Sequence, residues 1–197
     1  INKSKNPLYT SIVLPRYHRY SGRDLWSFNP EEIRSIDKLF IYSVKQISSI
    51  KKLSLNTHVT TGENFHEPLI DISSYQKTIG QSYESALNQS SSMLCIGMST
   101  TLIEAILSPV PTLWLCPSQM EPYLDGYLLS LYQEMSKNGL VFTEKSDFSR
   151  LESILDPSNY PSLKKLHLQT NNLLVCKLNI YSLKNFINEI SNLVNNF

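Results

Sequence analysis

A chain of 197 residues can bury one hydrophobic core, and 41% hydrophobic with 18% charged residues is typical of a globular protein, not a disordered one. The net charge of +1 gives no reason to expect nucleic acid or another polyanion as a partner. No apolar run reaches the ~20 residues of a membrane-spanning helix, which excludes such a helix from this sequence.

The residues that most often bind metals show no metal-binding pattern here. The chain has an odd number of cysteines, namely Cys95, Cys116 and Cys176. It has no CxxC or HxxxH spacing of the kind that binds zinc. Two of these cysteines lie in predicted buried strands, so we expect reduced core residues of a cytosolic protein and no metal site. His58 precedes a buried run and His167 lies on a predicted helix, and we interpret both as structural.

The N-terminal part of the chain begins with a predicted strand and a long helix. The apolar run YTSIVLPR (9–16) predicts a strand that ends at Pro15 and Arg16. Asn29 is a good N-cap and Pro30 suits the first helical position, so a helix is predicted to begin there. Its apolar residues recur every three or four positions and predict one buried face. These residues are Ile33, Ile36, Phe40, Val44, Ile47 and Ile50. We then expect a strand over 56–62, a polar irregular loop over 63–77 and a helix over 80–90.

Strands and helices alternate in the C-terminal part. Strands are predicted at 93–97, 111–116 and 140–143, and helices at 101–107 and 123–139, with two further helices at the end of the chain. The second of these helices is predicted to end at Asn138 and Gly139, and the last of all to carry an apolar stripe from Ile180 to Leu193. Because strands that are apolar on both faces alternate with helices, we predict an α/β fold with a parallel sheet covered on both sides.

Three consecutive hydroxyl residues join the strand at 93–97 to its helix. In an open α/β sheet, ligands bind at the carboxyl ends of the strands, which is where Ser99, Thr100 and Thr101 fall. The unpaired N–H groups of a helix N-terminus and nearby hydroxyls together suit a phosphate group. Gly97 lets the chain turn away from the sheet. We therefore predict a phosphate site at this turn.

The same residues allow other interpretations. Glu104 lies one turn into the helix, where an ionised carboxylate could accept two hydrogen bonds from a ribose diol. Alternatively, Thr101 and Glu104 form a capping box, which explains both residues without a ligand. Gly97 and Ser99 also begin the G-x-S-x-G pattern of a nucleophile elbow, but Thr101 stands where the strained turn needs a glycine.

A basic cluster, formed by Arg16, His18, Arg19 and Arg23, follows the first strand. It therefore also belongs at the carboxyl edge of the sheet. One arginine there could clamp a diphosphate through paired donors. For Arg19 and Arg23 we favour a solvated loop, and for Arg16 neither interpretation is preferred. His18 is a candidate general base, although a lone histidine in a loop seldom has that role.

The stretch STTLIEAILSPVPTLWLCP (99–117) resembles the C-terminal half of GT-B glycosyltransferases, which binds the nucleotide-sugar donor. In that family the hydroxyl turn contacts the diphosphate and the helix Glu contacts the ribose. The resemblance puts these roles on Ser99, Thr100, Thr101 and Glu104.

More specifically, the chain is similar to uncharacterised bacterial transferases linked to surface-carbohydrate loci. They share the PRYHRYSG segment (15–22) and a T-T-x-x-E helix start. The segment that begins SQMEPYLDG (118–126) resembles the loop beside the donor sugar, which implies sugar contacts for Gln119 and Glu121. The resemblance covers 9–155, and the segment 63–77 departs from it as an insertion.

The resemblance implies a Rossmann-like sheet with C-terminal helices, forming a single donor-binding domain over 1–197. Because the chain starts at Ile1 and the Gly-rich loop that opens this half is missing, we interpret it as incomplete at its N-terminus. The missing half would bind the acceptor and usually supplies the catalytic base, or a partner subunit would replace it. The catalytic residues are therefore unassigned, with Arg16 and His18 as the candidates.

The implied function is transfer of a sugar from a nucleotide-sugar to a glycan or lipid-linked acceptor during surface polysaccharide synthesis. We expect this to take place in the cytoplasm or at the inner face of the membrane, without nucleic acid. No cofactor or metal is expected, because no Asp-x-Asp pair stands at a strand end. The alternatives are a nucleotide-sugar epimerase of the same fold, a non-catalytic donor-binding subunit that needs a partner chain, and an α/β domain without a nucleotide.

Overall fold

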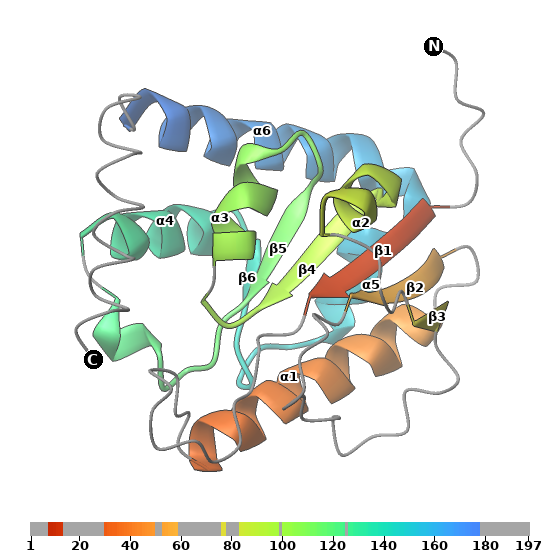
Figure 1. Cartoon of the computed structure of the whole chain (residues 1–197), viewed down its shortest axis with the longest axis horizontal. Coiled ribbons are helices and arrows are strands. Elements are labelled where there is room, and N and C mark those ends of the chain that lie inside the picture. The colour runs from red at the N-terminus through yellow and green to blue at the C-terminus, as the bar shows by residue number, and fades with distance from the viewer. Residues whose placement is uncertain are drawn as a thin grey trace.

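A fully parallel sheet forms the centre of the molecule (Figure 1). The computed structural model describes residues 8–13, 30–49, 53–58, 76–77, 83–98, 100–124 and 126–177. Within these residues the sheet has six strands in the order β3-β2-β1-β4-β5-β6. The strands are β1 (Leu8–Val13), β2 (Leu53–His58), β3 (Gln76–Lys77), β4 (Ser92–Ile96), β5 (Thr112–Leu115) and β6 (Val141–Phe142).

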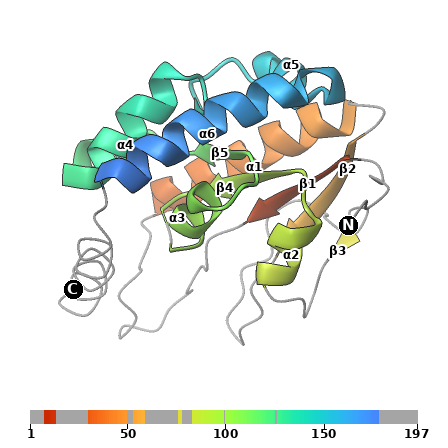
Figure 2. The same ribbon diagram turned by 90° about the horizontal axis from the view of Figure 1, so that it is seen from above.

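Helices cover both faces of this sheet. In Figures 1 and 2, α2 and α3 lie on one face, and α1 lies on the opposite face, where it contacts α5. The long helix α6 contacts α3, α4 and α5. The helices are α1 (Pro30–Ser49), α2 (Tyr83–Gln89), α3 (Thr100–Leu107), α4 (Gly126–Lys137), α5 (Ser149–Leu155) and α6 (Tyr160–Lys177). This arrangement confirms the predicted α/β class and gives a Rossmann-like strand order.

The strand order reverses between β1 and β4. β1 pairs with β2 on one side and with β4 on the other, so that Val13 lies between His58 and Cys95. The chain builds the sheet outward in one direction from β1 and in the other from β4. Because all six described strands are parallel, their carboxyl ends share one edge of the sheet, which we call the carboxyl edge. Ligands of such folds bind at this edge where the order reverses.

Strands β4 and β5 are buried on both faces. Every residue of β4 and β5 is buried, as expected for parallel strands covered by helices on each side. Trp114 packs edge-on against Tyr132 of α4, with ring centroids 5.7 Å apart. Cys95 and Cys116 are free and buried, as predicted. Burial raises the pKa of each thiol to about 12, with Glu121 and Glu144 adding to the shift at Cys116, so both stay protonated at neutral pH.

Most predicted elements exist, with three corrections. β2 begins at Leu53, three residues before the predicted start, and residues 59–62 lie outside the described part. Gln76 and Lys77 form β3 at the sheet edge, although the sequence predicts a loop there. The predicted helix 123–139 is a 3-10 turn (Glu121–Tyr123) followed by α4, because Leu124 between them is extended.

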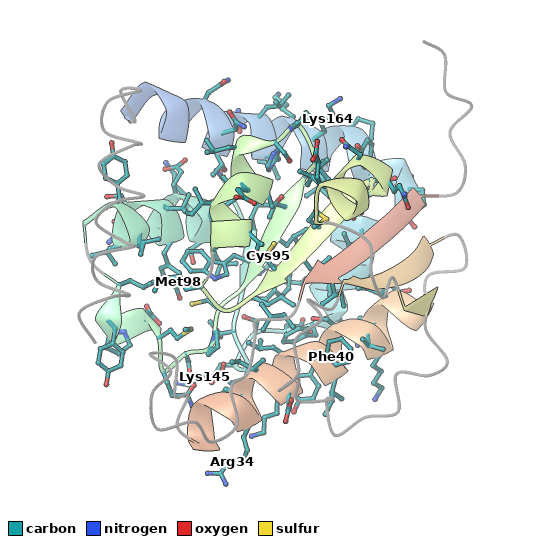
Figure 3. The ribbon with its side chains drawn as sticks, viewed as in Figure 1. Arg34, Phe40, Cys95, Met98, Lys145 and Lys164 are labelled. Carbon is teal, nitrogen blue, oxygen red and sulfur yellow. The ribbon has the colours of Figure 1, made fainter. Side chains whose placement is uncertain are left out.

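The buried stripe of α1 is confirmed where it is described. Ile36, Phe40, Val44 and Ile47 are buried, and Figure 3 shows Phe40 beneath the sheet. The side chains of the other two predicted stripe residues lie outside the described part. So does the segment 178–197 that carries the predicted last stripe.

Buried hydrogen bonds join α6 to the segment that connects α3 and β5. The Nε2–H of His167 donates to the Ser108 carbonyl at 2.8 Å, and its Nδ1 accepts from the Thr112 N–H at 3.3 Å. Asn171 donates to the Ile106 carbonyl at 3.0 Å. Burial lowers the pKa of His167, partly offset by the Ser108 bond, which keeps the ring neutral. The prediction that His167 is structural is therefore confirmed.

Candidate functional site

The turn after β4 is held firmly against β5. Gly97 is buried and has φ of 73°, a left-handed conformation that favours glycine. Its N–H donates to the Leu115 carbonyl at 2.9 Å, and its own carbonyl accepts from the Trp114 indole N–H at 2.8 Å. The predicted turn at Gly97 is thus confirmed, and the chain enters α3 three residues later.

Helix α3 begins at Thr100, one residue earlier than predicted. Thr101 is therefore the second residue of the helix, and Glu104 lies beyond the first turn with its side chain exposed. A capping box would place Thr101 before the helix and Glu104 as its third residue, one position from the helix start seen here. The capping box therefore stays an alternative. Ser99 lies outside the described residues, as does the side chain of Thr100.

The two sequence-predicted clusters are attached to neighbouring strands. The segment with Arg16 and His18 follows β1, and the hydroxyl turn follows β4. Arg16 and His18 themselves lie outside the described residues. β1 and β4 are paired in register, Val13 beside Cys95, so both segments leave the sheet at the point where the strand order reverses.

The loop after β5 carries the other two predicted residues, at the same edge of the sheet. Gln119 is half-buried, and among the described residues its Oε1 atom is buried without a hydrogen-bond partner. A buried acceptor left unpaired costs about 1–3 kcal/mol, so a hydroxyl donor at this position would be favourable. Glu121 is exposed and lies near Tyr132 of α4. Burial and, next, the negative charge of Glu121 raise the pKa of Tyr132.

A hydrogen-bonded carboxylate that the sequence analysis missed joins this loop to the end of β6. Glu144 accepts from the Ser118 N–H at 2.9 Å through Oε2 and from the Ser118 hydroxyl at 2.6 Å through Oε1. Ser35, a buried residue of α1, adds a side-chain hydrogen bond. Burial alone would raise the pKa of Glu144, but these bonds outweigh it and hold the pKa below its usual range. Glu144 is therefore ionised at neutral pH.

Charge differs along the carboxyl edge. At the carboxyl ends of β5 and β6, Glu121 and Glu144 are both close enough to raise the pKa of Cys116. Beside β4, the N-terminus of α3 presents the positive end of a helix dipole. An anionic group is thus favoured at the β4 end and disfavoured at the β5–β6 end. Figure 3 shows Met98 at the turn before α3 and Lys145 further along this edge, whereas Lys164 lies toward the opposite edge.

Two further classes of site have no counterpart in the described part of the chain. No group of three or more His, Cys, Asp and Glu side chains there is arranged to hold a metal ion. None of the described helices combines the length and the hydropathy needed to cross a membrane.

Comparisons with known proteins find a distant likeness at the level of structure. No protein-family model matches the sequence, and no curated protein matches it. A solved structure, described as the glycotransferase of kitacinnamycin, is similar to this chain with a TM-score of 0.49 and 11% sequence identity. The likeness covers 87% of this chain, which spans 40% of the length of that structure.

Proposed function

We propose that this chain is the nucleotide-sugar-binding half of a GT-B-type glycosyltransferase. It would serve surface polysaccharide synthesis, with a glycan or lipid-linked acceptor held by a further half or a partner subunit. One observation carries the proposal: the strand order reverses between β1 and β4, the two strands that are followed by the basic cluster and the hydroxyl turn. Binding sites of open α/β sheets lie at this point.

The proposed diphosphate site is the start of α3. Backbone N–H groups at the start of α3 and the hydroxyls of Ser99, Thr100 and Thr101 would donate to phosphate oxygens, and Arg16 would add charge from the β1 side. The buried turn at Gly97 supports this role because its two backbone hydrogen bonds fix the entry to the helix. As the sugar leaves, these donors would stabilise the charge that develops on the diphosphate.

The proposed nucleoside and sugar contacts lie on either side of the diphosphate. The exposed carboxylate of Glu104 would accept hydrogen bonds from the ribose hydroxyls. Gln119 and Glu121 follow β5, the next strand of the sheet, and would face the sugar. The catalytic base is expected outside the described residues, with His18 as the candidate in this chain. Arg16 is the other candidate catalytic residue and would stabilise the charge on the leaving diphosphate. No metal or cofactor is part of the proposal.

The test is thermal unfolding with a panel of nucleoside monophosphates, diphosphates and nucleotide-sugars. A ligand at ~100 times its Kd adds about 2.7 kcal/mol to the free energy of unfolding, which is easily measured. We expect one nucleotide series to raise Tm, and Glu104→Gln to remove most of that rise. Glu152→Gln is the matched control, because Glu152 is also an exposed helical glutamate but lies on α5, away from α3.

Both variants should unfold close to the wild-type temperature without ligand, since Glu104 and Glu152 are both exposed. If no nucleotide raises Tm of the folded wild type, the proposal is wrong. Equal loss of the rise in Glu104→Gln and Glu152→Gln would remove Glu104 from the site.

A further inference from the structure

The loop after β5 meets other elements at two points, one on each side of Gln119. Ser118 is bound through both its N–H and its hydroxyl by the carboxylate of Glu144, which lies 26 residues later in the chain. Glu121 lies close enough to Tyr132 of α4 for its negative charge to raise the pKa of that side chain, after burial as the larger cause. Between these two points, Gln119 keeps a buried Oε1 atom that no described residue satisfies.

Glu144 is itself fixed by the turn that follows β6. The Ser146 hydroxyl accepts from the Thr143 N–H at 2.8 Å, and the Ser146 N–H donates to the Thr143 carbonyl at 2.9 Å. Phe142 and Phe148 on either side are buried and pack together, with ring centroids 5.6 Å apart. The carboxylate therefore projects from a rigid turn and can hold the more exposed loop in one place.

Both carboxylate oxygens of Glu144 are already used within the protein. Oε2 accepts the Ser118 N–H, Oε1 accepts the Ser118 hydroxyl, and Ser35 adds a further bond. Such charge-assisted hydrogen bonds are about twice as strong as neutral ones. Glu144 is therefore suited to position another residue and not to contact a ligand directly.

We propose that Glu144 is a positioning residue that acts through Ser118 to hold Gln119 toward the sugar of a bound nucleotide-sugar. This inference rests on the proposed function and adds to it a residue that sets recognition of the sugar without touching it. It separates two parts of the ligand, because the α3 end of the site would bind the nucleoside diphosphate without help from this loop.

The experiment measures Kd of a nucleoside diphosphate and of the corresponding nucleotide-sugar by calorimetry on the 197-residue chain. Glu144→Ala removes the hydrogen bonds to Ser118. We expect this loss to weaken binding of the nucleotide-sugar about tenfold. Binding of the diphosphate should stay within about twofold of the wild type. Glu144→Gln should keep most of the sugar affinity, because its amide can accept from the Ser118 N–H and donate to the Ser118 hydroxyl.

Two further variants complete the design. Ser118→Ala removes only the hydroxyl bond and tests the same contact if Glu144→Ala does not fold; it should weaken nucleotide-sugar binding by about threefold. Glu152→Ala is the control for loss of an exposed acidic side chain and should change neither Kd.

Each outcome bears on a different claim. Equal weakening of both ligands, no weakening of the nucleotide-sugar, or equal losses in Glu144→Gln and Glu144→Ala would overturn the positioning role. A wild type that binds the diphosphate but gains no affinity from the sugar overturns this inference and leaves nucleotide binding intact. A wild type that binds neither ligand overturns the proposed function itself.

Discussion

His167 is a buried histidine with both ring nitrogens engaged. Nε2–H donates to the Ser108 carbonyl, so Nδ1 must be the acceptor for the Thr112 N–H. A proton added to Nδ1 would remove that acceptor and bury a charge. Burial accordingly lowers the pKa of His167 below its ordinary value, which is about 6.5.

This pKa shift predicts a pH dependence of stability. Below pH ~6.5 the unfolded state takes up a proton that folded His167 does not, so the free energy of unfolding falls as pH falls toward the lowered pKa. Glu144 contributes little in this window, because its lowered pKa affects stability only as the pH falls toward and below the ordinary glutamate value of 4.5. We expect chemical denaturation to show lower stability at pH 5.5 than at pH 7.5.

His167→Leu isolates this contribution. It should cost about 2 kcal/mol at pH 7.5, because the Thr112 N–H and the Ser108 carbonyl lose their partner. The variant should also show a smaller difference between the two pH values than the wild type. Gln169→Ala, at an exposed position of the same helix, should keep the wild-type difference. An unchanged pH dependence in His167→Leu would refute the assignment.

At this scale the sequence predicted some roles and missed others. The buried state of Cys95 and the structural role of His167 follow from their place in apolar, regular segments. Ser118 and Glu144 were missed because their contact joins residues far apart in the chain. The sequence nevertheless held a signal for both residues, because Ser118 closely follows β5 and Glu144 closely follows β6. Residues after these strands also lie at the carboxyl edge, by the reasoning used for β1 and β4.

Among the elements, α4 ends in a Schellman motif at the predicted glycine. The Gly139 N–H donates to the Ser136 carbonyl at 2.9 Å, and the Leu140 N–H donates to the Met135 carbonyl at 2.8 Å. Gly139 has φ of 70°, and a Cβ added there would lie 2.9 Å from Nη2 of Arg150. The motif satisfies two helix-end carbonyls and leads the chain directly into β6.

Gly139→Ala should therefore destabilise the protein by about 1–2 kcal/mol through left-handed strain, with a small addition from the Arg150 contact. Gly126→Ala is the matched control: φ is 45°, but no atom lies within 4 Å of the added Cβ. Denaturant unfolding should show losses in both, larger for Gly139, and the difference should vanish when Arg150 is also replaced by Ala. Unchanged or increased stability of Gly139→Ala would contradict this account.

The elements that were predicted correctly are those whose pattern is local. The apolar runs of β4 and β5 and the periodic apolar stripe of α1 predict burial from the sequence alone, because each pattern lies within one element. β3 was missed because Gln76 and Lys77 are polar and pair with Asn56 and Thr57 only through the assembled sheet. The start of β2 was misplaced because LSLNTH alternates apolar and polar residues only weakly.

For the whole molecule, the order of the strands is the feature that the sequence could not supply. Several of the strands are short apolar runs, and nothing in their composition says which of them are neighbours. The order places β1 beside β4, the two strands that precede the basic cluster and the hydroxyl turn, which the sequence assigned only to a shared edge of the sheet. The proposed function depends on this neighbourhood more than on any single residue.

Hydrogen–deuterium exchange with and without a saturating nucleoside diphosphate tests the proposed diphosphate site at the start of α3 most directly. The account predicts slower exchange in peptides covering 97–104, at the start of α3, and unchanged exchange over 108–112, at the opposite edge of the sheet. Protection that is absent at 97–104, or that is confined to the opposite edge, would contradict the account.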